Sequence, residues 1–482
     1  MTLPPPRKIL LIVLVSFLLL IPCFWHDHIQ AGDLGSHTYN VWLAQLLEQG
    51  RAPGVYVVWQ SQNVLFDELV LYLAKAVGLA AAERISVSFC VLIFFWGVFA
   101  LVAAATSRPP WFLTPFMAML AYGYTFHMGF LNYYLSVGLA CIGLALIWRG
   151  RREQQVAGFL FAPLIFLAHP LGALWFLGSA AYLLLWQRFV KWRIALPPLA
   201  VACVLLARWA VALRAGEDID WPDLPFYVFN GADQFAVFGS RFWYIAAAAF
   251  ALGLLMAGLD FRKERAKSWW GERRLLFELY GVSFCATALL PENLQMSPDS
   301  GWIGLLVSRL SLITATLALC LLGSLRPQKW HPAASAGCAL VFFAFVYQDT
   351  GFVDRLERNA EALTRQLPFG TRLLKSVYPP ADWRTPFIYH SVDRSCIGHC
   401  FAYSNYEAST KQFRIRARED SPVVVSDPGE SEAMESGEYD VERADLPMKQ
   451  IYQCDPSDLT KLCIRDLAPG EKNGRMGYHP TN

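Results

Sequence analysis

The chain contains 482 residues, of which 55% are hydrophobic and only 17% are charged. These proportions lie on the membrane side of ordinary soluble usage. The net charge of +2 is too small to indicate a nucleic-acid-binding protein, and no basic stripe interleaved with aromatic residues is present in the sequence. Aromatic residues reach 14%, and many Trp and Tyr residues flank apolar runs, as they do at membrane–water interfaces.

The N-terminus carries Arg7 and Lys8 in front of an apolar run at 9–22, a pattern shared by signal peptides and membrane anchors. No convincing small-residue cleavage site follows, because residues 23–26 are the bulky Cys-Phe-Trp-His, and Ala31-Gly32 is only a weak candidate. Many apolar runs come later in the chain. We therefore expect this segment to be retained as an uncleaved anchor.

The apolar runs predict about eleven membrane-spanning helices. The expected spans lie near 8–24, 84–105, 111–126, 130–148, 156–169, 171–187, 194–213, 241–259, 274–290, 301–323 and 332–348. The fifth and sixth meet at His169-Pro170, which we interpret as a tight outer turn rather than a kink in one long helix. Merging them would place the basic cluster at 262–274 outside, against the positive-inside rule.

With the N-terminus in the cytoplasm, basic and acidic residues are predicted to lie on opposite sides of the membrane. Basic residues then fall inside, at 7–8, 108, 149–152, 188–193, 262–274 and 326–329. The outer connections carry acids instead, namely Asp33, Asp67, Glu68, Glu217, Asp218, Asp220, Asp223, Asp233, Glu292 and Asp299. An odd number of spans also places the polar tail, residues 349–482, outside. We expect a bacterial inner-membrane protein with a periplasmic tail.

The first outer connection, residues 25–83, is long and contains two expected amphipathic helices. Its first helix has apolar residues at helical spacing and ends at Gly50 and Pro53; the apolar residues are Tyr39, Trp42, Leu43, Leu46 and Leu47. The second, at 64–77, is interrupted by three charged residues and predicts an interfacial helix. The membrane domain is therefore expected to be residues 1–348, with this loop included.

The tail is expected to form a small extracytoplasmic α+β domain. Residues 386–390 and 411–416 have strand-like patterns, and the acidic stretch at 427–442 is interpreted as a loop. Its four cysteines are Cys396, Cys400, Cys454 and Cys463. An even number in an exported segment favours two disulfides, for which three pairings exist. A metal site that also uses His390 and His399 is the rival interpretation.

Residues 32–39, Gly-Asp-Leu-Gly-Ser-His-Thr-Tyr, follow the first span directly, and residues 168–172, Ala-His-Pro-Leu-Gly, form a later outer turn. This arrangement resembles the integral-membrane C-type-fold (GT-C) glycosyltransferases that use polyprenyl-phosphate sugars. The resemblance covers most of residues 1–350 and implies a catalytic acidic residue at Asp33. An Asp-x-Asp pair is absent from the obvious loops, unless Asp218 and Asp220 form one, which leaves a requirement for a divalent metal open.

Asp33 is the candidate catalytic base, since one carboxylate within reach of the acceptor suffices to activate it. The alternative is that Asp33 only caps the helix that starts at Leu34. His37 lies one helical turn further on and is expected to share a face with Asp33, where it would orient the carboxylate, join a metal site or contact phosphate. Asp67 and Glu68 are more simply interpreted as solvated residues of an interfacial helix.

Arg309 lies within the apolar run 302–322, where an ionisable residue is by default a functional hypothesis. Its guanidinium is a candidate ligand for the lipid phosphate, with snorkelling to the interface as the alternative. Arg208 raises the same question but is more simply structural. His127 and His169 are candidate substrate-binding residues in two outer turns, where each alone would more often be a packing residue.

We therefore expect a polytopic membrane glycosyltransferase that moves a sugar from a polyprenyl-phosphate donor to a glycan, lipid or protein acceptor at the outer face. No phosphate-binding Gly-rich loop and no dinucleotide fingerprint is present, which disfavours ATP-driven transport and soluble-cofactor redox chemistry. Two rivals remain. One is an envelope polysaccharide polymerase or ligase, with its catalytic loop at 214–240, and the other is a non-enzymatic membrane or transport protein.

Overall fold

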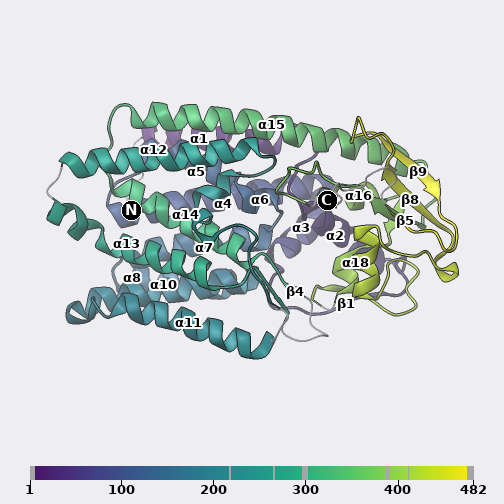
Figure 1. The fold of residues 1–482 in the computed structure, drawn as a ribbon, viewed down its shortest axis with the longest axis horizontal. Coiled ribbons are helices and arrows are strands. Elements are labelled where there is room, and N and C mark those ends of the chain that lie inside the picture. The colour runs from purple at the N-terminus through teal and green to yellow at the C-terminus, as the bar shows by residue number, and fades with distance from the viewer. Residues whose placement is uncertain are drawn as a thin grey trace. The chain divides into compact units, whose positions relative to one another are not determined.

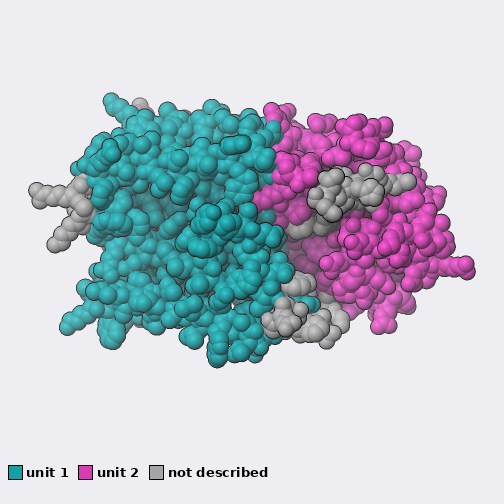
Figure 2. All heavy atoms as spheres, in the orientation of Figure 1, with its two compact units in different colours: residues 1–21, 87–126, 131–346 teal, residues 22–86, 127–130, 347–482 magenta. Residues whose placement is uncertain are grey.

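The computed structural model describes residues 6–215, 219–263, 266–295, 302–386, 388, 390–410 and 412–474. The chain divides into two compact units, coloured separately in Figure 2. Unit 1 comprises Met1–Ile21, Val87–Phe126 and Leu131–Val346. Unit 2 comprises Pro22–Ser86, His127–Phe130 and Tyr347–Asn482, so the first outer connection and the tail belong to the same unit.

Unit 1 consists mainly of helices (Figure 1). They are α1 (Pro6–Leu20), most of α4 (Leu79–Thr106), α5 (Thr114–Ala121), α6 (Tyr124–His127), α7 (Leu131–Trp148), α8 (Arg152–Phe159), α9 (Ala162–Ala168), α10 (Pro170–Arg188), α11 (Leu196–Ala215), α12 (Arg241–Lys263), α13 (Ala266–Leu289), α14 (Leu306–Ser324) and the first part of α15 (His331–Thr364). Helix α7 packs against α8, α9 and α10, while α13 packs along α14 and α11.

Six helices of the described residues are long and apolar enough to cross a membrane. They are α4, α7, α11, α12, α14 and α15, and the run at Lys8–Cys23 is apolar but shorter. The expected span at 111–126 is divided between α5 and α6, and that at 156–169 between α8 and α9. Broken helices therefore lie at these two positions, and the count of about eleven spans stays a prediction.

The turn expected at His169-Pro170 separates α9 from α10. His169 is the N-cap of α10, and its Nδ1 accepts a hydrogen bond of 3.1 Å from the Leu171 backbone N–H. Pro170 occupies the first helical position, where the missing N–H costs nothing. The local sequence therefore accounts for both the end of one helix and the start of the next.

Three short strands of unit 1 form one antiparallel sheet: β2 (Ile219–Asp220), β3 (Asn293–Gln295) and β4 (Trp302–Ile303). Glu292, which precedes β3, accepts hydrogen bonds from the backbone N–H groups of Val307 and Ser308 at 2.8 and 3.2 Å. These are N–H groups of the first turn of α14, which have no partner within the helix. Glu292 thus caps α14 from a distance in the sequence.

Unit 2 combines helices with two small sheets. Its remaining elements are α2 (Leu34–Glu48), β1 (Val55–Val57), α3 (Leu65–Val77), β5 (Thr371–Ser376), α16 (His390–Ser395), β6 (Cys400–Ala402), α17 (Tyr406–Ser409), β7 (Ile415–Ala417), α18 (Pro428–Ser436), β8 (Met448–Gln453) and β9 (Leu462–Asp466). The larger sheet has the order β6-β5-β8-β9, with β5 parallel to both neighbours and β9 antiparallel to β8.

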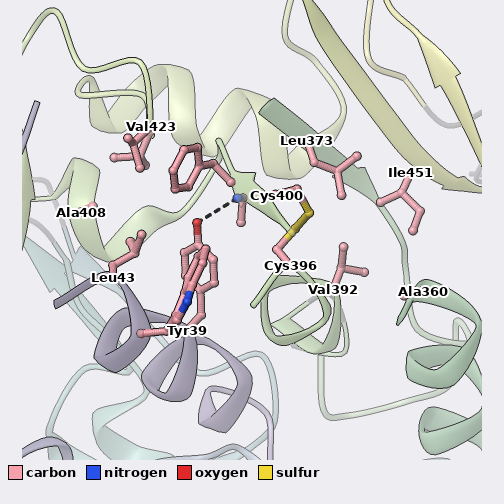
Figure 3. Packing of buried hydrophobic residues seen from close by; sticks show 14 of the residues in the cluster. Tyr39, Leu43, Ala360, Leu373, Val392, Cys396, Cys400, Ala408, Val423 and Ile451 are labelled. Carbon is pink, nitrogen blue, oxygen red and sulfur yellow. Dashed lines mark hydrogen bonds between the residues drawn. A yellow bond between two sulfur atoms is a disulfide. The ribbon is translucent and has the colours of Figure 1, made fainter. Parts of the chain in front are cut away.

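The first outer connection and the tail share one fold. Strand β1 of the connection pairs antiparallel with β7 of the tail, and Tyr56 lies opposite Arg416. Figure 3 shows Tyr39 and Leu43 of α2 in one hydrophobic cluster with Val392 of α16. The Tyr39 hydroxyl also accepts a hydrogen bond of 3.0 Å from the Ala402 backbone N–H. Segments more than 300 residues apart in the sequence thus form one core.

The tail cysteines form two disulfides, Cys396–Cys400 and Cys454–Cys463, with Cα atoms 4.7 and 5.8 Å apart. This is the local one of the three possible pairings. Cys396 and Cys400 are buried in the cluster that Figure 3 shows. Because all four tail thiols are used in this way, the rival interpretation of a cysteine-containing metal site was wrong.

Two local predictions in the tail were also wrong. The acidic stretch expected to be a loop contains α18, whose N-cap Asp427 accepts a hydrogen bond of 2.9 Å from the Glu430 backbone N–H. Gly437 ends this helix at φ +83°, in the left-handed region that glycine favours. The expected strand at 386–390 is not formed: of its described residues, His390 begins α16, and residues 387 and 389 lie outside the described residues.

Candidate functional site

Asp33 lies immediately before α2, and its backbone is held on both sides. Its N–H donates to the Met128 carbonyl at 3.1 Å, and its carbonyl accepts from the His37 N–H at 2.9 Å. Its carboxylate makes no capping hydrogen bond to α2, although Asp33 occupies the N-cap position. The alternative of a side-chain helix cap is therefore wrong.

The glycines of the motif allow unusually close backbone contacts. A Cβ atom on Gly32 would lie 2.3 Å from the Met128 carbonyl oxygen, and one on Gly35 would lie 2.1 Å from the His390 carbonyl oxygen. Both distances are far below van der Waals contact, and both neighbours are backbone atoms that cannot rotate away. The two glycines therefore bring the turn at Asp33 directly against the 127–130 segment and against α16.

His37 is paired with Asp67 of α3, its Nδ1 lying 2.7 Å from the Asp67 Oδ1. Burial opposes a charge on this imidazole, but Asp67, with Glu407 and Asp33 nearby, outweighs that effect and raises the His37 pKa to about 10. His37 is therefore a cation at neutral pH. Asp67 is an ion-pair partner rather than a solvated residue, so our preferred interpretation of Asp67 was wrong. Glu68 pairs instead with Arg414 at 3.0 Å.

Glu407 of α17 is the third carboxylate of this cluster. It accepts a hydrogen bond of 2.8 Å from the Ser36 hydroxyl and lies 4.0 Å from the His37 Nδ1. Burial is the main reason that its pKa rises, to about 7, while His37 opposes the rise and Asp67 and Asp33 add to it. A carboxyl group with such a pKa exchanges a proton near neutrality, which is the property that acid–base chemistry requires.

His390 approaches Asp33 from α16 of the tail. Its Nε2 lies 3.7 Å from the Asp33 Oδ1, and its Nδ1 lies 2.7 Å from the Asp393 Oδ2. The side chain of Asp33 is 14% exposed, whereas that of His390 is 1% exposed. We define the acid–base cluster as Asp33, His37, Asp67, Glu407 and His390. It combines two imidazoles with three carboxylates, of which Asp33 and Asp67 are partly exposed.

His127 belongs to the turn that contacts Asp33, but its imidazole has a different task. The ring is buried, and its Nδ1 lies 2.9 Å from the Gln30 carbonyl oxygen. Burial lowers the His127 pKa to about 4, against a smaller opposing effect of the Gln30 carbonyl. His127 is thus neutral at physiological pH and joins two backbone segments of unit 2. The prediction that it binds substrate stays untested.

Two of the predicted site residues, Arg309 and His169, lie in unit 1. Arg309 lies in the first turn of α14, closer to the helix end than the sequence indicated, and its Nη1 donates to the Gly304 carbonyl at 2.6 Å. Tyr133 links it to His169, because the Tyr133 hydroxyl donates to the Arg309 carbonyl at 2.7 Å and its ring lies edge-on to the imidazole. Unit 1 thus brings Arg309 and His169 together around one tyrosine.

Other candidates have structural roles. Arg208 donates to the Leu289 carbonyl and lies over the ring of Trp221, 4.1 Å from its centroid. Asp220 is exposed in β2, and Asp218 lies outside the described residues. Among the described residues, no group of three or more His, Cys, Asp or Glu side chains is arranged to hold a metal ion.

Sequence reasoning missed the roles of Glu407 and His390 in this cluster. One local signal for His390 exists, since His390 and Asp393 are three residues apart and share a helix face. No signal near Glu407 points to α2. Comparisons of the chain with protein-family models, curated proteins and solved structures find no match. The fold itself defines a mostly helical protein with several helices compatible with a membrane.

Proposed function

We propose that the protein is an integral-membrane glycosyltransferase that transfers a sugar from a polyprenyl-phosphate donor to a glycan, lipid or protein acceptor, with Asp33 as the base. The observation that carries this proposal is the Asp33 carboxylate, which does not cap its helix and is partly exposed beside two imidazoles. A base needs such access to its acceptor, together with neighbours that control its charge.

The chemistry assigned to Asp33 is a direct displacement. As the acceptor oxygen or nitrogen bonds to the anomeric carbon, the bond from that carbon to the phosphate oxygen breaks, and Asp33 takes the acceptor proton. Inversion at the anomeric carbon follows from a single displacement. The cationic His37 lies nearby, and Asp33 accepts the proton in its ionised form. General-base catalysis of this kind contributes about 10²–10⁴-fold.

Two features of unit 1 support a lipid-linked donor. One is an apolar cavity of 240 Å³ between α12, α13 and α14, lined by residues such as Phe250, Leu254 and Leu322. The other is Arg309 at the start of α14, a guanidinium suited to a phosphate oxygen pair. A cavity of this composition accepts hydrocarbon, whereas a soluble nucleotide sugar would need polar walls.

The proposal includes a location: a bacterial inner membrane crossed about eleven times, with a cytoplasmic N-terminus and an extracytoplasmic tail. Reporter fusions after residues 60, 150, 225 and 470 test it. We expect extracytoplasmic signals at 60, 225 and 470 and a cytoplasmic signal at 150. A signal at 60 from the side opposite to that at 470 would contradict the proposal, because Asp33 and the tail share unit 2.

The activity is tested with the full-length chain in lipid nanodiscs. Radiolabelled undecaprenyl-phosphate sugars carrying glucose, mannose, galactose or arabinose serve as donors, and an envelope extract from cells without this chain supplies acceptors. We expect transfer of at least one sugar, and a loss of about 10²-fold or more in Asp33→Asn.

The matched control is Asp27→Asn, because Asp27 belongs to the same connection but is exposed and paired with Arg358, which is also exposed, at 3.2 Å. This variant should keep wild-type activity. Equal transfer by wild type and Asp33→Asn, or no donor consumption by either, would contradict the proposal and favour a non-enzymatic protein.

The rival of a polysaccharide polymerase places the catalytic loop at 214–240. Its Asp233 is 1% exposed, and both of its carboxylate oxygens lie within 2.7 Å of the Ser311 hydroxyl. A carboxylate buried in this way is a structural partner of α14 rather than an accessible base. This contact favours the transferase proposal, with its base in the first connection.

A further inference from the structure

His390 connects Asp33 to a buried chain of charged groups in the tail. Its Nε2 is 3.7 Å from Asp33, and its Nδ1 is 2.7 Å from Asp393. Both oxygens of Asp393 lie 2.6 Å from the Nζ of Lys375, a residue of β5. The side chains of Lys375 and Asp393 are 2% and 0% exposed, so this chain leads from the sheet to the one member that contacts solvent, Asp33.

The proton on His390 can be assigned from its partners. Burial acts against the charge on Asp393, but Lys375 and His390 outweigh it and hold the Asp393 pKa below its usual range. An ionised carboxylate only accepts hydrogen bonds, so the Nδ1 of His390 carries a hydrogen. Nε2 is then the nitrogen that exchanges a proton, and it is the nitrogen that faces Asp33.

The surroundings of His390 contain few other charges. Glu435 of α18 lies 3.5 Å from the Lys375 Nζ, and burial raises the Glu435 pKa while Lys375 and His390 oppose the rise. The ring of Tyr406, from α17, lies 5.3 Å from the imidazole centroid. Asp33 and Asp393 lie beside the imidazole, and Lys375 contacts Asp393.

The position of His390 relative to Asp33 is fixed by the backbone. Gly35 of α2 touches the His390 carbonyl so closely that a Cβ atom would lie 2.1 Å from it. Val392 and Cys396, from the same segment as His390, pack with Tyr39 of α2 in the cluster of Figure 3. A side chain held this rigidly against a candidate base is the arrangement that preorganised sites require.

We propose that His390 is a positioning residue supplied by the tail, which receives through Nε2 the proton that Asp33 takes from the acceptor. The acceptor proton moves to the Asp33 Oδ1 and from there to Nε2, while the electron pair of the sugar–phosphate bond leaves with the polyprenyl phosphate. Asp393 stabilises the imidazolium, and Asp33 regains its charge. This inference rests on the proposed function and makes the tail part of the reaction centre.

Two substitutions of His390 by amide residues distinguish a proton relay from a packing role of this side chain. In His390→Asn the side-chain amide lies where Nδ1 was, next to Asp393, and in His390→Gln it extends to the position of Nε2, next to Asp33. Neither amide takes up a proton. The matched control is His399→Gln, a half-buried histidine of the same tail segment.

Using the nanodisc assay and donors described above, we expect both His390 variants to lower kcat about 10–100-fold with an unchanged donor KM. We also expect the acidic limb of the pH–rate profile to move to lower pH, because the imidazole no longer has to be neutral and only Asp33 titrates. His399→Gln should match wild type. A wild-type rate, or an unmoved acidic limb, in either His390 variant would overturn the relay.

A measurement on the wild-type protein covers the case in which the variants do not fold. In single-turnover transfer by protein with isotope-labelled histidine, time-resolved infrared difference spectra should show an imidazolium forming with the product if His390 receives the proton, and a protonated carboxyl group if Asp33 keeps it. A protonated carboxyl group without an imidazolium overturns the relay. If Asp33→Asn is inactive and the His390 variants transfer at the wild-type rate, only this inference is contradicted. If Asp33→Asn is itself active, the proposed function is contradicted.

Discussion

The two compact units bury polar side chains of different kinds. In unit 1, Gln234 is fully buried and bonds to the Thr125 hydroxyl and the Ser308 carbonyl at 2.8 and 3.1 Å. Such neutral contacts join one helical segment to the next. One ion pair, Arg273 with Asp260 at 3.0 Å, is also buried there, and it links α13 to the end of α12.

Unit 2 buries charges in connected groups. Arg394 lies between Glu83 and Glu357, with nitrogen–oxygen distances of 2.8 and 2.7 Å, and all three side chains are at most 8% exposed. The pairs of His37 with Asp67 and of Lys375 with Asp393 lie in the same unit. Networks of this type shift pKa values and cluster at functional sites, although purely structural networks do so as well. The comparison shows that unit 2, which has fewer apolar helices, holds the charged groups to which our proposal assigns the chemistry.

The largest expected effect comes from Arg394→Met. Removal of this guanidinium leaves Glu83 and Glu357 buried without their cation, which costs about 3–5 kcal/mol of unfolding free energy. Urea unfolding in detergent micelles, followed by tryptophan fluorescence, measures it. Lys75→Met is the control, because Lys75 is 48% exposed and its pair with the exposed Glu48 contributes about 0–1 kcal/mol.

A second variant in the same background sharpens the result. Arg394→Met combined with Glu357→Gln removes one of the two stranded charges and should recover part of the lost stability. No recovery would mean that Arg394 acts through packing, and the contrast between the two units would then lose its electrostatic basis.

Much of the fold could be predicted from the sequence because its signals are local. The helix at 34–48 follows from apolar spacing and from its end near Gly50, and the break at His169-Pro170 follows from proline. The loop predicted at 427–442 failed although local signals were present: Asp427 before a proline and Gly437 after an acidic run form a helix with both caps.

The candidate site could be predicted only in part. Asp33 was recognised from its position, but other members of the cluster come from distant segments: Asp67 lies 30 residues from its partner His37, and His390 comes from the tail. Hydrophobic periodicity shows which face of α3 is buried and does not show that Asp67 meets a histidine. A glycine at 35 is compatible with the close backbone approach that the structure shows against the His390 carbonyl, but it does not identify that neighbour.

The next effect concerns pH. His37 has a pKa of about 10 in the folded chain and about 6.5 when unfolded, so between these values the folded state holds one more proton. The stability that this proton contributes is complete below pH 6.5 and is lost as the pH rises through 10, at about 1.4 kcal/mol per pH unit. In His37→Gln, urea unfolding at several pH values should show a flatter dependence in this window.

Glu407→Gln is the matched comparison because its window is different. Burial raises the Glu407 pKa from 4.5 to about 7, so the stability from its extra proton is complete below pH 4.5 and is lost as the pH rises through 7. This variant should flatten the curve between pH 4.5 and 7 only. If both variants flatten the same window, the two groups titrate as one coupled pair.

The smallest expected effect comes from two helical glycines that differ in the space around them. Alanine favours a helix over glycine by about 1 kcal/mol, so a substitution without a clash should be neutral or stabilising. Gly178 of α10 in unit 1 has no atom within 4 Å of an added Cβ. At Gly35 of unit 2, the added Cβ would lie 2.1 Å from the His390 carbonyl oxygen, and relief of this overlap by separation of α2 from α16 costs about 1–3 kcal/mol.

We therefore expect Gly178→Ala to change the unfolding free energy by no more than about 1 kcal/mol in either direction, and Gly35→Ala to lower it. Gly35→Ala should also lower transfer activity while Gly178→Ala retains it, because a shift of α16 moves the His390 imidazole away from Asp33. Equal stability and activity in the two variants would show that α2 and α16 tolerate separation. The close contact at Gly35 would then be a packing detail without influence on the acid–base cluster.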